Sequence, residues 1–264
     1  MGPHRFISIV SLALLALAFT SRPLTAEPPP FFPMPQDHIL EPAGRPILAG
    51  IAGGIDYNVH RGEFYLSEDG IVCCRFEEGS GMGLVAGAKA FIPLSDEIDL
   101  SPRLQYEGRG GEFRSLSDPL PFFGRNNEVE MVRFEDRLET TIGTIGVDLL
   151  AGYRVTDFGL YVTAGPSAGF VVTKSFVKSE SIAEPAGVQY LNGVTAKETF
   201  RGELDIVNPV LLSIRGGIGA MVEVADGIHI NPEVLYGLPL NRISREDNWK
   251  GSTIQGTLGI LIAL

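Results

Sequence analysis

The stretch "IDLSPRLQYE" (98–107) decides the fold class, because apolar and polar side chains alternate along it. One face of an extended chain would be apolar: Ile98, Leu100, Pro102, Leu104 and Tyr106. The opposite face would be polar and charged: Asp99, Ser101, Arg103, Gln105 and Glu107. A period of two residues is typical of a β-strand, whose successive side chains point to opposite sides. The stretch therefore predicts a strand with one apolar and one ionised face.

The same alternation recurs along the rest of the chain. It is found in seven further stretches: 47–58, 83–92, 145–154, 160–170, 210–222, 228–236 and 253–264. Three of the connections are tight turns: "PLSDE" (93–97), "VTDF" (155–158) and "EVADG" (223–227). Four others are long and polar: about 59–82, 109–138, 173–205 and 238–251. The sequence thus predicts eight strands, with short turns at one end and long loops at the other.

An internal repeat relates four of these strands. "IDLSPRLQY" (98–106) matches "IHINPEVLY" (228–236), and "VTAGPSAGF" (162–170) and "AGIAGGIDY" (49–57) fit the same frame. Each copy ends on an aromatic residue, four positions after a proline or glycine: Tyr57, Tyr106, Phe170 and Tyr236. Aromatic residues at one level are typical of a membrane–water interface, so we expect an aromatic girdle. Proline cannot donate to a ladder, so the repeat also predicts local bulges.

The second face of the strands distinguishes a membrane barrel from a soluble sandwich. It combines glycine and small residues with charges of both signs, and we expect an ion-pair network there: Lys89, Arg103, Glu107, Asp148, Arg154, Arg215 and Glu233. The interior of an eight-stranded barrel is just wide enough for such side chains. A secreted soluble β-sandwich with a charged outer face is the alternative, since its strands alternate too. The even strand count and unequal loops favour an all-β, eight-stranded antiparallel up-and-down transmembrane β-barrel.

The N-terminal region predicts export. Residues 1–26 have the pattern of a signal peptide, with an apolar run (6–19) too short for a spanning helix. The proline-rich segment 27–45 predicts an extended periplasmic lead, and residues 46–264 the barrel. Removing Arg5 and Arg22 with the signal leaves 21 − 2 = 19 basic against 32 acidic residues, or −13. Such a charge argues against nucleic acid as a partner.

The chain ends on "TLGILIAL" (257–264), which resembles the C-terminal assembly signal of bacterial outer-membrane barrels. The matching positions are Thr257, Gly259, Ile262 and Leu264, with leucine standing last where an aromatic residue is usual. The resemblance implies the barrel-assembly machinery as a partner. It also implies that the last strand closes against the first, which would leave no unpaired edge.

From about Pro46 onward, the chain resembles the PorT-like outer-membrane β-barrel family, within the broad outer-membrane protein A-like class. The similar segments are "SPRLQY", "NPEVLY", "LLAGYRV", "LYVTAGP" and the more particular "CCRFEEGSGMG". The resemblance implies a bacterial outer-membrane location, with outer-membrane lipid as the surrounding partner. It implies little about activity.

Two adjacent cysteines, Cys73 and Cys74, fall in the first predicted long loop. An even cysteine count in an exported protein suggests a disulfide, and a strained bond between neighbours would be labile. A structural clip or two packed thiols is the alternative. A zinc site would need four ligands, and in sequence only His60 lies nearby, so we expect neither metal nor cofactor.

Other residues bear on function. His60, with Glu63, Ser67 and Glu68, could form part of a lipid-modifying enzyme, but no nucleophile motif accompanies it. A narrow pore is a further alternative, although eight strands leave no open channel. "PLPFFG" (119–124) and Trp249 could mark contact sites on loop tips, pack against each other, or lie at the lipid headgroups. We therefore expect a non-enzymatic barrel with a plugged polar interior and long extracellular loops, in a structural or interaction role.

Overall fold

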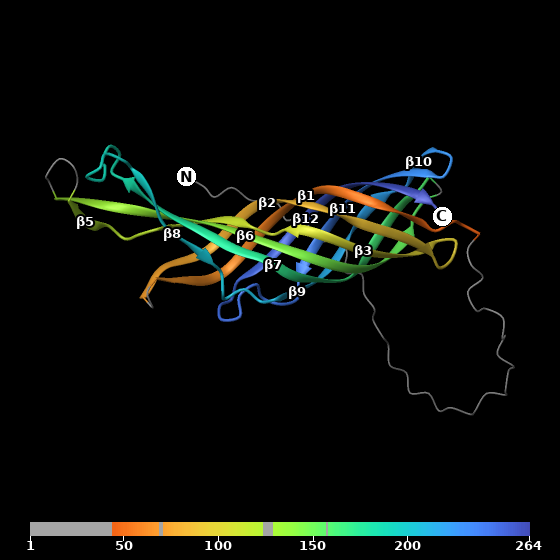
Figure 1. Ribbon diagram of the computed structural model, residues 1–264, viewed down its shortest axis with the longest axis horizontal. Coiled ribbons are helices and arrows are strands. Elements are labelled where there is room, and N and C mark those ends of the chain that lie inside the picture. The colour runs from red at the N-terminus through yellow and green to blue at the C-terminus, as the bar shows by residue number, and fades with distance from the viewer. Residues whose placement is uncertain (1–43, 69–70, 124–128, 157) are drawn as a thin grey trace, which may run out of the picture. The chain divides into compact units, whose positions relative to one another are not determined.

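The computed structural model describes residues 44–264, except 69–70, 124–128 and 157 (Figure 1). The predicted signal peptide and most of the predicted lead segment lie outside the described residues. Within the described ranges, no helix has the length and apolar character needed to cross a membrane.

Eight antiparallel strands form a closed ring (Figure 1). In ring order they are β1 (Leu48–Glu68), β2 (Ile71–Pro93), β3 (Ile98–Gly108), β6 (Val129–Arg154), β7 (Leu160–Glu184), β9 (Val210–Ala220), β11 (Ile228–Pro239) and β12 (Lys250–Ala263). Each pairs with the next, and β12 pairs back with β1. The predicted barrel and its strand order are confirmed, and the soluble sandwich is excluded.

The closing seam holds the C-terminal stretch in place. The β1–β12 pairing runs from Leu48↔Ala263 to Arg61↔Lys250 without a register shift. Beyond it, the backbone N–H of Leu264 donates to the carbonyl of Ile47 at 2.9 Å. The apolar end of the chain is therefore one side of a paired seam, which leaves neither terminal strand with an open edge.

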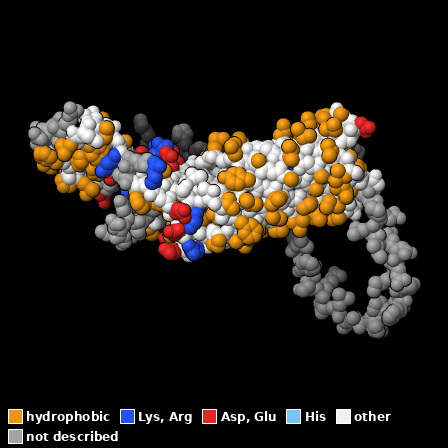
Figure 2. Space-filling view, viewed as in Figure 1, with side chains coloured by type: hydrophobic (Ala, Val, Ile, Leu, Met, Phe, Trp, Pro, Cys, Tyr) orange, Lys and Arg blue, Asp and Glu red, His pale blue; other side chains and the backbone are white. Residues whose placement is uncertain are grey.

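The outward side chains of the ring form an apolar belt. Its members include Ile51, Ile55, Leu84, Leu104, Val147, Val162, Ile218, Val234, Leu258 and Ile260, each between 44% and 71% exposed. Along β1 and the residue before it, the belt spans Ile47 to Tyr57, which is close to the roughly ten residues of a tilted spanning strand. Figure 2 shows this apolar surface over one part of the molecule and charged side chains gathered beyond it. The belt is the surface that faces lipid.

Beyond the belt, the strands continue into segments that the sequence predicted to be long loops. β1 and β2 pair as far as Glu68↔Ile71, and β6 and β7 pair as far as Arg133↔Glu184. Three short strands flank them: β4 (Gly111–Leu116), β5 (Leu120–Phe123) and β8 (Ala196–Glu203). At the opposite end, β10 (Val222–Ala225) pairs with β11. We call the described parts of 59–80, 111–142 and 173–204 the outer extension.

The loop prediction was therefore wrong for most of 59–82, 109–138 and 173–205. Outside the membrane the outward face is polar, as Arg61, Glu63, Arg75 and Glu77 on β1 and β2 illustrate. Here the apolar side chains, such as Phe64 and Phe76, face inward instead, and the backbone pairing continues. Only the part of each strand in contact with lipid could be recognised from the pattern.

The predicted proline bulges are absent at the three prolines of the internal repeat. Pro102 pairs with Leu149, Pro166 with Ile214 and Pro232 with Leu258, each without a register shift. Near Pro232, the side chain of Asn231 donates to the carbonyl of Ala220 at 2.7 Å. A side-chain donor thus satisfies a carbonyl beside the proline, and the strand stays regular.

Candidate functional site: the plugged barrel interior

A first charged cluster crosses the barrel interior around Glu233 on β11. Arg103 on β3 donates to both oxygens of Glu233, at 2.5 and 2.8 Å, and Lys89 Nζ on β2 lies 3.5 Å away. The Tyr161 hydroxyl on β7 donates to the same carboxylate at 2.9 Å. Arg103 and Glu233 are only 5% and 3% exposed. Because β3 and β11 lie across the ring from each other, this Glu233 cluster spans the lumen.

A second cluster lies nearer the outer end, around Glu107 on β3. Arg215 on β9 bonds to Glu107, and it lies 3.3 Å from Asp148 on β6. Arg109 pairs with Glu107 at 2.7 Å. The side chain of Gln105 donates to Glu107 at 2.5 Å and to Asp148 at 3.1 Å. All of these side chains are buried. Sequence reasoning missed Arg109, because it had assigned residue 109 to a loop.

One predicted member of the interior network lies elsewhere. Arg154 is the last residue of β6, at the short-turn end, and its Nε lies 3.0 Å from Asp99 Oδ2. Arg45 binds the other oxygen of Asp99 at 2.9 Å. The seven residues predicted to form the ion-pair network therefore lie in more than one place. Six of the seven residues divide between two interior clusters, and Arg154 belongs to a third at the barrel mouth.

Above the Glu107 cluster, four aromatic rings fill the barrel: Phe64, Phe76, Phe113 and Trp249. The rings of Phe64 and Trp249 stack at a centroid distance of 4.5 Å, and Phe113 meets Phe64 edge-on at 5.0 Å. Each of the four is at most 1% exposed. We call this group the aromatic plug. Trp249 is thus no surface contact site, and its aromatic partners are Phe64 and Phe113 rather than the predicted "PLPFFG" segment.

His60 lies between the aromatic plug and the backbone of Gly110, next to Arg109 in the chain. The indole N–H of Trp249 donates to His60 Nδ1 at 3.2 Å, and Nε2 lies 3.4 Å from the carbonyl of Gly110. Because indole nitrogen can only donate, Nδ1 must accept and Nε2 must carry the proton. His60 lies beyond the aromatic level, where the outward neighbour Arg61 is charged. The pKa of His60 is lowered to about 4, chiefly by burial; the bond to the Gly110 carbonyl opposes this shift, and the nearby Arg109 charge adds to it. The imidazole is therefore neutral at neutral pH.

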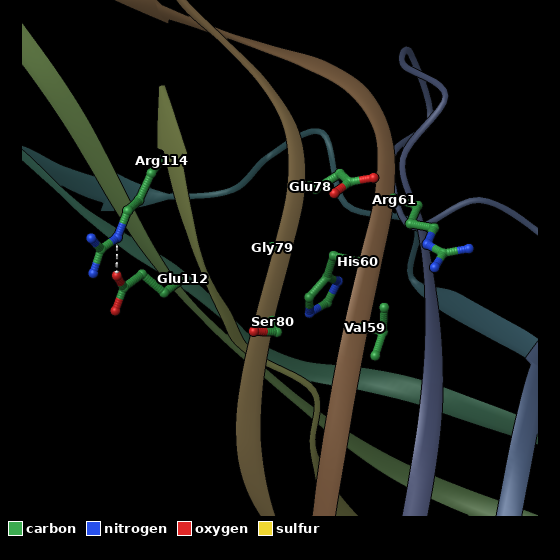
Figure 3. Close-up of a pocket in the computed structure, with 8 residues that line it drawn as sticks. All are labelled: Val59, His60, Arg61, Glu78, Gly79, Ser80, Glu112 and Arg114. Carbon is green, nitrogen blue, oxygen red and sulfur yellow. Dashed lines mark hydrogen bonds and ion pairs between the residues drawn. The ribbon is translucent and has the colours of Figure 1, made fainter. Parts of the chain in front are cut away.

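The outer surface at this height carries a pocket of about 560 Å³ (Figure 3). Its lining comes from three strands: Val59, His60 and Arg61 of β1, Glu78, Gly79 and Ser80 of β2, and Glu112 and Arg114 of β4. Serine, histidine and carboxylate groups meet here, so an acyl-transfer site has to be considered. Both nitrogens of His60 already have partners, however, so neither is available to activate Ser80.

The structure describes only part of the candidate group around His60. The Glu63 carboxylate pairs with Arg75 at 2.5 Å on the outer surface, and the side chains of Ser67 and Glu68 lie outside what the structure describes. Within the described part of the chain, no group of three or more histidine, cysteine or acidic residues could hold a metal ion.

Cys74 lies in β2 rather than in a loop, with its side chain buried beside Phe64 and Phe76. It accepts a hydrogen bond from Lys178, whose Nζ also lies 3.2 Å from Asp136. The backbone of Cys73 falls at a register shift, between Leu66↔Cys74 and Ser67↔Val72. The side chain of Cys73 is outside the described residues, so the disulfide stays a prediction.

The predicted girdle residues all point outward. Tyr57 and Tyr236 both pair with Ile254, whereas Tyr106 and Phe170 both pair with Ile145. They are 43–54% exposed. The four rings thus lie on the lipid-facing side in two matched pairs, and their contact with headgroups stays a prediction.

The residues of the predicted assembly signal lie along β12 and its end. Ile262 and Leu264 face outward, and Gly259 faces the interior. A Cβ at Gly259 would lie 2.9 Å from Cε of Lys89, so this glycine leaves room for the Glu233 cluster. An interior packing role therefore exists beside the predicted targeting role, which stays a prediction.

The closed ring, the lipid-facing belt and the charged interior define an outer-membrane β-barrel. Residues 42–245 match the family described as outer membrane protein beta-barrel domain. The match covers most of the chain, and the protein belongs to this family. It is a bacterial outer-membrane protein, as the sequence predicted.

Solved structures with a similar fold share little sequence with it. Neisserial surface protein A is 10% identical, with 82% of this chain and 99% of that chain covered and a TM-score of 0.33. The attachment invasion locus protein Ail of Yersinia pestis is 10% identical (83% and 99% covered, TM-score 0.29). The outer membrane protease OmpT from Escherichia coli is 9% identical (83% and 97% covered, TM-score 0.36). No curated protein matches the sequence. At this level of similarity, nothing these proteins do is transferred to this chain.

Proposed function

We propose that this protein is a non-conducting outer-membrane barrel that acts in interactions at the cell surface through its outer extension. The observation that carries the proposal is the filled interior. The Glu233 cluster, the Glu107 cluster and the aromatic plug occupy successive levels of the lumen with buried side chains. Within the broad family, we propose that the chain belongs to the PorT-like group, on the sequence resemblance alone.

The outer extension is a long sheet of hydrogen-bonded strands. From Ile145 to Val129, β6 runs seventeen residues, which at about 3.3 Å per step is roughly 50 Å of strand. Ion pairs link the strands on the outer face of the outer extension. Arg137 lies 2.6 Å from Glu112, and Arg114 lies 2.8 Å from the same carboxylate. Backbone pairing on this scale supports a surface that holds its shape rather than a set of loose loops.

An apolar group lies near the far end of the outer extension. Pro121 pairs with Met131, and Phe123 with Val129. All four are exposed; Phe123, Met131 and Val129 reach 53%, 58% and 68%. Figure 2 shows apolar side chains at this end, separated from the belt by charged ones. Exposed apolar groups rimmed by polar residues often mark contact sites. We call these four residues the apolar tip.

Two measurements test the proposal. The folded protein in planar bilayers should show no conductance steps above the lipid baseline; steady steps would instead support the narrow-pore alternative. A photoreactive residue placed at Phe123 should crosslink to a surface partner in intact cells, whereas one at Glu139, on the ion-paired part of β6, should not. Equal labelling at both positions would contradict a contact site at the apolar tip.

A further inference from the structure

A strip of basic side chains lies just outside the lipid-facing belt. Arg61 of β1 and Lys250 of β12 stand directly opposite each other in the closing seam, and both are exposed. Lys250 also lines a surface pocket of about 370 Å³ with Arg242 and Arg245, from the segment between β11 and β12. These four cations are adjacent through the seam and the pocket. We call them the basic strip.

Three of the four cations of the basic strip lack the ion pairs found elsewhere on this surface, and the fourth, Arg245, lies near Asp205. Among the described residues, Arg61, Arg242 and Lys250 form no ion pair within 4.0 Å, and Arg245 bonds to the backbone carbonyl of Asp205. Nearby surface arginines differ, because Arg75, Arg114 and Arg137 all have carboxylate partners. Glu78 stands opposite Arg61 on β2, yet Figure 3 shows no interaction between them, in contrast to Glu112 and Arg114.

The pairing of Arg61 with Lys250 places two cations directly opposite each other. Like charges directly opposite in an antiparallel pair are destabilising. The chain carries 32 acidic against 21 basic residues, so acidic residues are abundant, yet two cations face each other at Arg61 and Lys250. An anion bound at the strip would remove this repulsion.

The height of the strip indicates which anion is available. Arg61 lies four residues beyond Tyr57, and Lys250 four residues from Ile254, which pairs with Tyr57. At about 3.3 Å per residue and a tilt of about 40°, this is roughly 10 Å above the aromatic level. Polar headgroups occupy this zone outside the hydrocarbon core. Leu238 and Leu240, 51% and 55% exposed, extend the apolar surface of the barrel up to the pocket.

We propose that the basic strip binds the phosphate groups of an anionic lipid in the outer leaflet. The cations would hold the headgroup, while Leu238 and Leu240 contact the upper part of its acyl chains. Each basic residue near an anionic membrane surface strengthens binding by about fivefold, so two should contribute about 30-fold. A free phosphate ion would share the headgroup chemistry but not the acyl contact.

The test titrates the folded full-length protein in detergent with bisphosphorylated lipid A and counts bound lipid by native mass spectrometry. The R61Q/K250Q variant should bind about 30-fold more weakly than the unmodified protein. The control R133Q/K197Q makes the same change in net charge on the outer extension and should bind normally. Heat-dependent gel mobility confirms that each variant is folded, and R242Q/K250Q supplies a second variant of the strip.

Two further arms identify the source of the phosphate. Dephosphorylated lipid A should lose the strip-dependent binding, and excess inorganic phosphate should not displace the phosphorylated lipid. Equal weakening in the control, or unchanged binding in both strip variants, would overturn the proposal. Displacement by inorganic phosphate would overturn it too, because the strip would then be a small-anion site rather than a lipid site.

Discussion

Glu233 should be the residue on which the barrel interior depends most. It accepts two bonds from Arg103, one from Tyr161 and a longer one from Lys89, all below the aromatic level and away from bulk water. Glu233→Gln keeps the shape of the side chain but removes its charge. Arg103 and Lys89 would then remain as two buried cations without a counter-ion.

Breaking a buried charge pair by removing one partner costs about 3–5 kcal/mol. We expect the Glu233→Gln barrel to lose that much free energy of unfolding. The double variant Glu233→Gln/Arg103→Met should recover part of the loss, because only one of the two cations then stays unpaired. A control at Glu139, which is 57% exposed in its side chain, should change stability by less than about 0.5 kcal/mol when made Gln.

The assay is reversible denaturant unfolding of the barrel in lipid vesicles, followed by tryptophan fluorescence. The chain has one tryptophan, Trp249, which is fully buried in the aromatic plug and so reports on the loss of the interior. A loss below about 1 kcal/mol for Glu233→Gln would refute the reasoning, since it would place the cluster in contact with water rather than in a sealed lumen.

Three further predictions follow from single contacts. Because burial lowers the pKa of His60 from 6.5 to about 4, the unfolded chain binds its proton first as the pH falls. The contribution of His60 to stability is therefore complete above pH 6.5 and decreases by about 3 kcal/mol towards pH 4. The free energy of unfolding of the His60→Gln variant should depend less on pH between 6.5 and 4. The same pH dependence in the variant and the unmodified protein would contradict a neutral, buried imidazole. Trp249→Ala should lower the free energy of unfolding by about 3–5 kcal/mol, measured by circular dichroism. Phe123→Ala in the apolar tip should lower it far less, and equal losses in the two variants would contradict the aromatic plug. Gly54→Ala places a Cβ 1.9 Å from the carbonyl oxygen of Gly256 and should destabilise the barrel by about 1–3 kcal/mol. A Cβ at Gly256 would have no heavy atom within 4 Å, so Gly256→Ala should be tolerated. Thermal unfolding of both variants tests this difference.

The sequence predicted the membrane-spanning part of the fold well, because lipid on one side and a charged lumen on the other impose a clear alternation. The stretch 98–107 shows this, since every second side chain there faces the lumen and is buried. It did not predict the outer extension, where the apolar residues of β6, such as Leu138, face inward and charged residues such as Arg137 and Glu139 share the outward face.

The sequence predicted which residues of the candidate site face the interior, but not which of them contact each other. Alternation placed Lys89, Arg103 and Glu233 on the inner face, but it could not say which charges meet across the lumen. That pairing depends on strand stagger around the whole ring, which no local pattern contains. The burial of Trp249 was missed for the same reason, because its partners Phe64 and Phe113 come from strands distant in the sequence.

The account depends most on the outer extension being a folded sheet rather than a set of loops. Hydrogen–deuterium exchange of the vesicle-bound protein over residues 129–142 and 173–184 tests this directly, since β6 and β7 pair throughout these segments. We predict protection there that approaches that of the belt residues 145–154. Exchange at the rate of unstructured peptide in both segments would contradict the account, and would return the surface function to mobile loops.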